Sequence, residues 1–103
     1  PKGSKPVVVQ RDYHAPRSAA QKALELAPEL QTLMESLGVE VGVGVPIMKD
    51  DHEMLRIVYR FDSMVHWGQS VDKMVTDERF LGIVNAAHES ATLKSSRMLV
   101  KVE

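Results

Sequence analysis

The spacing of the hydrophobic residues changes several times along this chain, and four stretches show the two-residue alternation of a β-strand. The first stretch covers 6–14 and begins with a run of valines. The second covers 39–48 and alternates almost without error. The third covers 55–61, with four apolar residues on one side and two arginines and a valine on the other. A weaker alternation over 91–103 predicts a closing strand.

Between these strands the apolar residues recur every three or four positions, as one face of a helix requires. A first helix is predicted over 16–38, because proline fits the first turn of a helix and glycine ends many helices. Pro28 lies inside this helix, so we expect a kink or a short break there. A second helix begins after Ser63, whose hydroxyl can cap it, and a further helical segment begins after Thr76 or Asp77.

The order strand, helix, strand, strand, helix, strand predicts an α+β protein with the ferredoxin-like βαββαβ fold. We expect a four-stranded, antiparallel-type mixed sheet with two helical groups on one face. Right-handed crossovers predict that the first and third strands lie side by side at the centre and parallel, with the fourth and second strands outside. Nothing else in the chain can cover the second face, which we expect to be apolar, so a second copy is expected to cover it and form a homodimer.

Two glycines interrupt the polar side of the second strand. Gly42 and Gly44 suggest that another group approaches the backbone closely, and a packed helix is favoured over a ligand. Pro46 suggests that this strand lies at an edge of the sheet, where a missing N–H costs no ladder hydrogen bond. The polar residues 49–53 predict a turn between antiparallel strands.

Composition narrows the function. With 103 residues and 44% hydrophobic content, the chain is expected to form a single domain over 6–103 after a flexible lead at 1–5. A net charge of -1 with interspersed acids and bases argues against nucleic acid and membrane as partners. Cysteine is absent, which excludes disulfides and thiolate chemistry, and no stretch reaches the ~20 apolar residues of a membrane span. We therefore expect a soluble, cytoplasmic protein.

The parallel arrangement predicted for the first and third strands would bring their C-terminal ends to the same rim of the sheet. The starts of the outer strands and the helix termini would also reach this rim. It would then gather the polar residues Asp12, Tyr13, His14, Glu40, Arg60, Asp62, His66 and His88. A histidine here could act as a general base while Asp12 fixes its tautomer. The alternative, which is the more common one, is that such residues are solvated or cap helices.

From this rim we select the candidate catalytic residues His14, His66, Asp12 and Tyr13. Two arginines of the third strand could hold a carboxylate or an enolate in an apolar pocket, or could instead pair with an acidic residue across a dimer. An aromatic residue at helical spacing could stack on a ligand, although a core position is more common. The candidate substrate-binding residues are Arg60, Arg56, Trp67, Phe61, Tyr59 and His88.

Motifs for metals and nucleotides are missing from the sequence. No two of His14, His66, His88 and Glu40 have the close spacing of a recognised metal motif, so no metal site is predicted. There is no Ser-centred elbow, phosphate-binding glycine loop or dinucleotide fingerprint, because the Gly-x-Gly of the second strand is not followed by a helix. We expect no cofactor.

Three segments carry a resemblance to a known family. The segment 59–63 (YRFDS), the helix with Trp67 and the segment 77–80 (DERF) resemble the dimeric α/β-barrel superfamily, particularly its antibiotic-biosynthesis-monooxygenase-like branch. The resemblance implies two ferredoxin-like subunits packed sheet to sheet, each with a small-molecule cleft between sheet and helices. Members include cofactor-independent oxygenases of polycyclic aromatics, haem-degrading oxygenases, cyclases and isomerases. The chain has Gln10 and Val84 where the haem-degrading group has Asn and His, which argues against a haem role.

Several functions therefore stay open. In the first, the protein is a cofactor-independent, monooxygenase-like enzyme: His14 or His66 takes a proton from a hydrophobic aromatic or keto substrate, and Arg60 and Tyr13 stabilise the resulting anion. In the second, it is a non-catalytic protein that binds a hydrophobic ligand such as a fatty acid or another amphipathic carboxylate, with an arginine at the head group. A purely structural dimer is the third.

Overall fold

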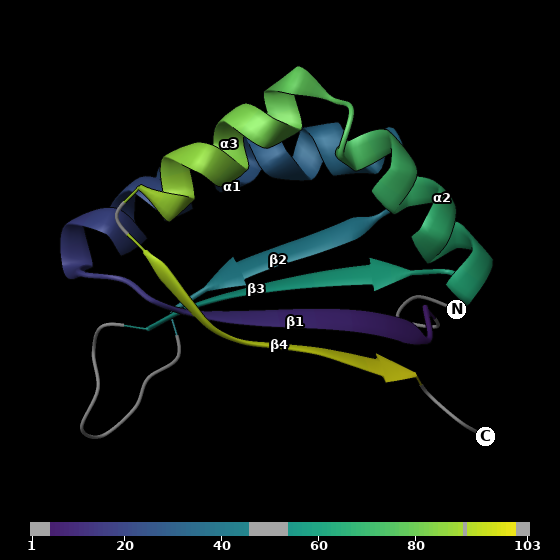
Figure 1. Cartoon of the computed structure of the whole chain (residues 1–103), viewed down its shortest axis with the longest axis horizontal. Helices are drawn as coiled ribbons and strands as arrows, with labels where there is room; N and C mark the ends of the chain where they lie inside the picture. Colours follow the sequence, from purple (N-terminus) through teal and green to yellow (C-terminus); the bar gives the residue numbers. More distant parts are fainter. Residues whose placement is uncertain (1–4, 46–53, 90, 101–103) are drawn as a thin grey trace.

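The chain folds into a layer of three helices over one four-stranded antiparallel sheet, as Figure 1 shows. The computed structural model describes residues 5–45, 54–89 and 91–100, and only the backbone of residues 87 and 88. The elements are β1 (Val7–His14), α1 (Arg17–Glu35), β2 (Glu40–Gly44), β3 (Met54–Phe61), α2 (Met64–Met74), α3 (Glu78–His88) and β4 (Thr92–Val100). This is the ferredoxin-like fold that the sequence predicts.

The strands lie in the order β2-β3-β1-β4, so the two strands predicted at the centre are there. The prediction that β1 and β3 are parallel was wrong: they run antiparallel, with Val7 opposite Phe61 and His14 opposite Met54. The right-handed crossover through α1 makes β1 parallel to β2, and β3 lies between them and runs opposite to both. The two C-terminal ends of the central strands therefore lie at opposite ends of the sheet.

Helix α1 runs unbroken through Pro28, so of the two alternatives expected there, a kink or a short break, the break does not occur. Proline removes one hydrogen bond there, but Leu30, Leu33 and Met34 in the turns that follow are buried in the core and hold the helix in place. The helix ends at Glu35, and the predicted stop, Gly38, lies in the turn that follows with a φ of 72°. The N–H of Val39 donates to the carbonyl oxygen of Met34 at 3.0 Å, so the left-handed glycine lets the chain fold back on the helix end.

Polar side chains begin the other two helices where the sequence predicts them. The Ser63 hydroxyl oxygen accepts a hydrogen bond from the N–H of His66 at 3.0 Å. One carboxylate oxygen of Asp77 accepts from the N–H groups of Arg79 and Phe80, at 2.8 and 3.0 Å. These bonds satisfy backbone donors that a helix start leaves without partners, so α2 and α3 are two separate capped helices.

The core lies between the sheet and the helices. Alternate residues of the two central strands point toward the helices, and the largest fully buried side chains are Phe61, Met34, Leu55 and Val7. The edge strand β4 is different, because every one of its residues is exposed. The helix layer therefore covers β2 and β3 better than β4. The space between the sheet and the helices is left uncovered on the side of β4.

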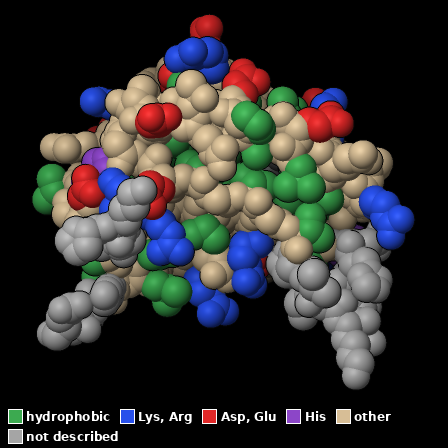
Figure 2. Space-filling view, turned by 180° about the vertical axis from the view of Figure 1, so that it is seen from behind, with side chains coloured by type: hydrophobic (Ala, Val, Ile, Leu, Met, Phe, Trp, Pro, Cys, Tyr) green, Lys and Arg blue, Asp and Glu red, His purple; other side chains and the backbone are tan. Residues whose placement is uncertain are grey.

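No described segment covers the second sheet face, and its composition corrects the expectation of an apolar surface. The valines of β1 and β2 that alternate with polar residues point toward the helices. The free face carries Val8, Gln10, Asp12, Glu40, Arg56, Val58, Arg60, Ser95, Arg97 and Leu99. Figure 2 likewise shows basic side chains among hydrophobic ones along the sheet side of the molecule. Charged and apolar groups are therefore mixed on this face.

The glycines of β2 also lie on the free face, since Gly42 is opposite Val58 and Gly44 is opposite Arg56. A Cβ atom built on either glycine meets no other atom within 4 Å, so the interpretation that a helix packs against them was wrong. The edge position predicted for β2 is confirmed. Pro46 itself and the turn predicted at 49–53 lie outside the described residues.

Candidate functional site

A cavity of about 150 Å³ lies between the two central strands and the helices α2 and α3. The alternation of the strands points residues 9 and 11 of β1 and residues 59 and 61 of β3 into it, while helical spacing brings one face of α2 over them. Its lining residues are Val9, Arg11, Tyr59, Phe61, Trp67, Val71, Met74, Val75 and Phe80. It is an apolar, largely aromatic space with a few polar groups, as small-molecule sites usually are.

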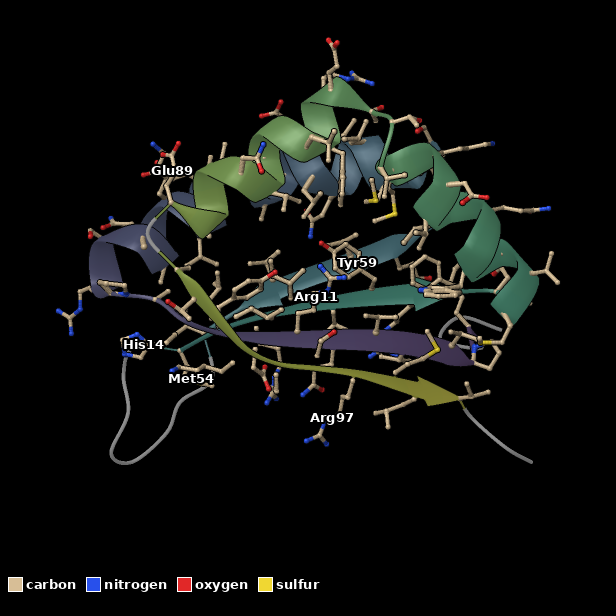
Figure 3. All side chains as sticks on the ribbon, viewed as in Figure 1. Arg11, His14, Met54, Tyr59, Glu89 and Arg97 are labelled. Carbon is tan, nitrogen blue, oxygen red and sulfur yellow. The ribbon has the colours of Figure 1, made fainter. Side chains whose placement is uncertain are left out.

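Arg11 is the charged residue in this lining. Figure 3 shows its side chain pointing from β1 into the space between sheet and helices, beside Tyr59, whereas Arg97 points away on the opposite side of the sheet. The Nε atom of Arg11 is buried and has no hydrogen-bond partner among the described residues. A buried donor without a partner is uncommon in folded proteins, and it marks a position where a ligand atom would be stabilised.

Tyr59 supplies a second polar group. Its side chain is 4% exposed, and burial raises the pKa of its phenol to about 12. The neighbouring phenol of Tyr13 adds to this rise, while the positive charge of Arg11 opposes it. Tyr59 is therefore a neutral hydroxyl at physiological pH, able to donate a hydrogen bond toward the cavity.

Asp12 and Arg56 form an ion pair on the free face of the sheet, away from the cavity. The Nε and Nη2 atoms of Arg56 donate to the two carboxylate oxygens of Asp12, at 2.7 and 3.2 Å. Gln10 and Ser95 donate further hydrogen bonds to this carboxylate, at 3.3 and 3.5 Å. The bonds from Arg56 outweigh the effect of burial and hold the pKa of Asp12 below its usual value.

His66 is held by the backbone on both sides of its ring. Its Nδ1 accepts from the N–H of Asp62 at 2.9 Å, so Nε2 carries the proton and donates to the carbonyl oxygen of Leu37 at 2.7 Å. Lys5 donates to the Asp62 carboxylate and to the carbonyl oxygen of Gly38, both at 2.8 Å. The bond from Lys5 lowers the pKa of Asp62. These bonds fasten the start of α2 to the turn after α1.

The single polar rim predicted from the sequence does not form, because β1 and β3 are antiparallel. Asp12, Tyr13 and His14 lie at the end of the sheet where β4 begins. The second group, Glu40, Arg60, Asp62 and His66, lies at the opposite end, where Glu40 is opposite Arg60. His88 is the last residue of α3, and its side chain lies outside the described residues.

Of the candidate binding residues, Tyr59, Phe61 and Trp67 line the cavity together. Arg56 and Arg60 lie on the other face of the sheet. Sequence reasoning missed Arg11, although one signal was available: it is the charged member of an otherwise apolar or aromatic alternation formed with Val7, Val9 and Tyr13. A charge on a core-facing side of a strand requires either a partner or a ligand.

Among the residues that the structure describes, no group of three or more His, Asp or Glu side chains is arranged to hold a metal ion. Within the same residues, no helix has the length and hydrophobicity needed to cross a membrane.

Comparison with known proteins identifies the fold. No protein-family profile matches the sequence, and no curated protein does either. Solved structures do match. An antibiotic biosynthesis monooxygenase is similar with a TM-score of 0.68 and 11% identity, over 94% of this chain and 99% of that one. A NIPSNAP family protein from Agrobacterium tumefaciens gives 0.68 and 19% identity, over 94% and 86%.

A third similar structure is SnoaB, a cofactor-independent oxygenase from Streptomyces nogalater, with a TM-score of 0.65 and 8% identity over 95% of each chain. At these identities the likeness concerns the fold, over almost the whole chain. The protein thus has the ferredoxin-like fold of the antibiotic-biosynthesis-monooxygenase-like proteins, as the resemblance of its central segments implies.

Proposed function

We propose that the protein binds a small hydrophobic molecule in the cavity between the sheet and the helices α2 and α3. The observation that carries this proposal is the combination of the aromatic side chains of Phe61, Trp67 and Phe80 with the Arg11 Nε, a donor that has no partner among the described residues. Aromatic rings bind a flat apolar body, and a fixed donor orients it. The exposed edge strand β4 leaves one side of this space open, which gives a ligand a way in.

Enzymatic activity is the second candidate, because SnoaB, whose fold is similar, is a cofactor-independent oxygenase. In such a reaction Arg11 and Tyr59 would stabilise the anion of an aromatic or keto substrate after a proton leaves it. The described lining contains no Asp, Glu or His to take this proton. Binding is therefore proposed first. Oxygen uptake with enolisable aromatic substrates, lost in Arg11→Met but retained in Arg97→Met, would establish catalysis.

We also propose that the protein works as a homodimer, with the free sheet faces of two copies packed together. A face of four strands this long presents about 500 Å² of projected area. The side chains that project from this face make its accessible area larger than its projected area. The accessible area is therefore close to the ~800 Å² that each partner buries in a standard interface. Apolar Val8, Val58 and Leu99 lie there among charges of both signs, as in many protein interfaces.

Native mass spectrometry of protein from its own host tests both proposals at once, because it reports the mass of the assembly and of any retained small molecule. We expect a dimer that carries a ligand. A monomer would contradict the homodimer.

Ligand binding can be followed through Trp67, the chain's one tryptophan, which lines the cavity. We expect its fluorescence to change when small aromatic compounds are added. Val71→Phe should abolish the change because it fills the cavity, whereas Val65→Phe should not, because Val65 on the same helix is 69% exposed. Equal responses in the two variants would contradict binding in this cavity.

A further inference from the structure

We infer that the ligand of this cavity is a single-ring aromatic carboxylate, whose carboxylate is held by Arg11 and Tyr59 and whose ring lies between Phe61, Trp67 and Phe80. This inference rests on the proposed binding function and names the chemical class of the ligand. Three observations carry it: the Arg11 Nε without a partner among the described residues, the lack of an acidic side chain in the described lining, and the size of the cavity.

The guanidinium edge of Arg11 can be compared with that of Arg56 in the same molecule. Arg56 binds the Asp12 carboxylate side-on, through Nε to one oxygen and through Nη2 to the other. Arg11 has the same edge, but its buried Nε has no partner among the described residues. The planar guanidinium of an arginine matches the two oxygens of a carboxylate. Asp12 is the carboxylate that binds Arg56, so we expect the group that binds Arg11 to be a carboxylate as well.

The two polar side chains of the described lining, Arg11 and Tyr59, can both donate hydrogen bonds, and neither carries a negative charge. Arg11 carries a permanent positive charge, and the Tyr59 hydroxyl is a neutral donor beside it. No acidic side chain belongs to the described lining. The positive charge of Arg11, whose Nε is buried, favours an anionic ligand over a neutral molecule of the same shape.

The volume of the cavity limits the rest of the ligand. About 150 Å³ is the size of a protein cavity that holds one benzene ring. Aromatic rings stack on or meet the edges of other aromatic rings, and three of them line this space. A long acyl chain or a polycyclic body would not fit here without displacing core side chains. The cavity is therefore suited to one ring with its carboxylate at the Arg11 end.

The inference is tested by titrating the protein with benzoate and with benzamide, its neutral isostere, while following Trp67 fluorescence. We expect benzoate to bind about 10- to 100-fold more tightly, since a charge-assisted pair is lost with benzamide. Arg11→Met should remove this preference and leave benzamide binding unchanged. Arg11→Lys should keep part of it, because lysine retains the charge but not the fork.

The matched control is Arg97→Met, which removes one positive charge from the opposite face of the sheet and should leave the preference intact. Equal affinities for benzoate and benzamide, or a preference that survives Arg11→Met, would overturn the carboxylate inference while leaving the binding proposal in place. If neither compound binds, and no other single-ring aromatic does, the proposed function fails as well. Circular dichroism of each variant confirms that it is folded.

Discussion

Two arginines on the neighbouring central strands, Arg11 and Arg56, belong to opposite faces of the same sheet and have opposite surroundings. Arg56 lies on the free face, 41% of its side chain is exposed, and its Nε and Nη2 atoms donate hydrogen bonds to Asp12. Arg11 lies under the helices, where its Nε is buried and has no partner among the described residues. Arg56 therefore has a partner on the free face, whereas the buried Nε of Arg11 has none among the described residues.

This difference distinguishes Arg56, whose charge stabilises the fold, from Arg11, whose charge we propose to bind a ligand. Water could have solvated Arg56, yet the chain provides it with a carboxylate, so its pairing with Asp12 ties β1 to β3. Water reaches the Arg11 Nε poorly and none of the described residues accepts its hydrogen bond, so its burial costs free energy that a bound ligand would offset under the proposed function. The helix-covered face is thus proposed as the binding face, and the free face as the one for a second copy.

The largest expected effect distinguishes the packing of the two faces. Phe61 is 1% exposed under the helices, and Phe61→Ala should lower the free energy of unfolding by about 3–5 kcal/mol. Val58 on the free face is only partly buried in the single chain, and Val58→Ala should cost about 1 kcal/mol. Urea denaturation at low protein concentration measures both. A similar cost for the two variants would mean that the free face is packed as tightly as the core.

The second effect comes from Tyr59 and appears at alkaline pH. Its folded pKa of about 12 lies above the ordinary value of 10.0, so the unfolded chain loses this proton first as the pH rises. The native state should therefore lose about 2–3 kcal/mol of stability between pH 10 and pH 12. Tyr59→Phe should lack this loss. An equally steep decline in Tyr59→Phe would assign the alkaline transition to other groups.

The third effect concerns the satisfied arginine. Asp12→Ala leaves Arg56 without its carboxylate and should lower the free energy of unfolding by about 1–2 kcal/mol at neutral pH, since the pair is partly exposed. Arg11→Met should instead be neutral or slightly stabilising, because it removes a buried donor that has no partner. If both variants destabilise equally, the contrast between the two arginines is lost.

The same pair gives a pH dependence with a definite sign. The pKa of Asp12 is lowered in the folded protein, so its contribution to stability is present above the ordinary carboxyl pKa of 3.8 and is lost as the pH falls through the lower folded value. As the pH falls, the free energy of unfolding should decrease more steeply in the wild type than in Asp12→Asn. Parallel curves would contradict the linkage.

Local signals in the sequence were strong enough to predict the elements. The change from two-residue to helical spacing at Ser63, and the acidic residue at Asp77, fixed the starts of α2 and α3 because each cap acts within three residues. The order of elements was enough for the fold class. The directions of the strands could not be predicted from local signals. To decide that β3 runs opposite to β1, three strands and one crossover had to be placed together.

The site was harder to predict than the fold. Tyr59, Phe61 and Trp67 were predicted as candidates because aromatic residues on a core-facing side are visible in the spacing, and they line the cavity. Arg11 was passed over in favour of Arg56 and Arg60, because a sequence does not tell which charged residue finds a partner across the sheet. That depends on register: Asp12 lies directly opposite Arg56, whereas Arg11 lies opposite Ile57.

The smallest expected effect sharpens the contrast on the free face. Gly42 has a backbone that any residue can adopt, and a Cβ there meets nothing within 4 Å. Gly42→Ala should therefore stabilise the monomer by about 0.5 kcal/mol, by reducing the freedom of the unfolded chain. Gly38→Ala is the control and should destabilise by about 1 kcal/mol, because its φ of 72° strains an alanine.

Denaturation of Gly42→Ala at low and high protein concentration then reports on the second copy. In the monomer the added methyl group projects into open space, so the gain should appear at low concentration. If two sheet faces pack with their backbones close at β2, the methyl group would hold them apart, and the gain should shrink as the dimer forms. A gain that stays constant with concentration would place any dimer contact away from Gly42, nearer to β1 and β4.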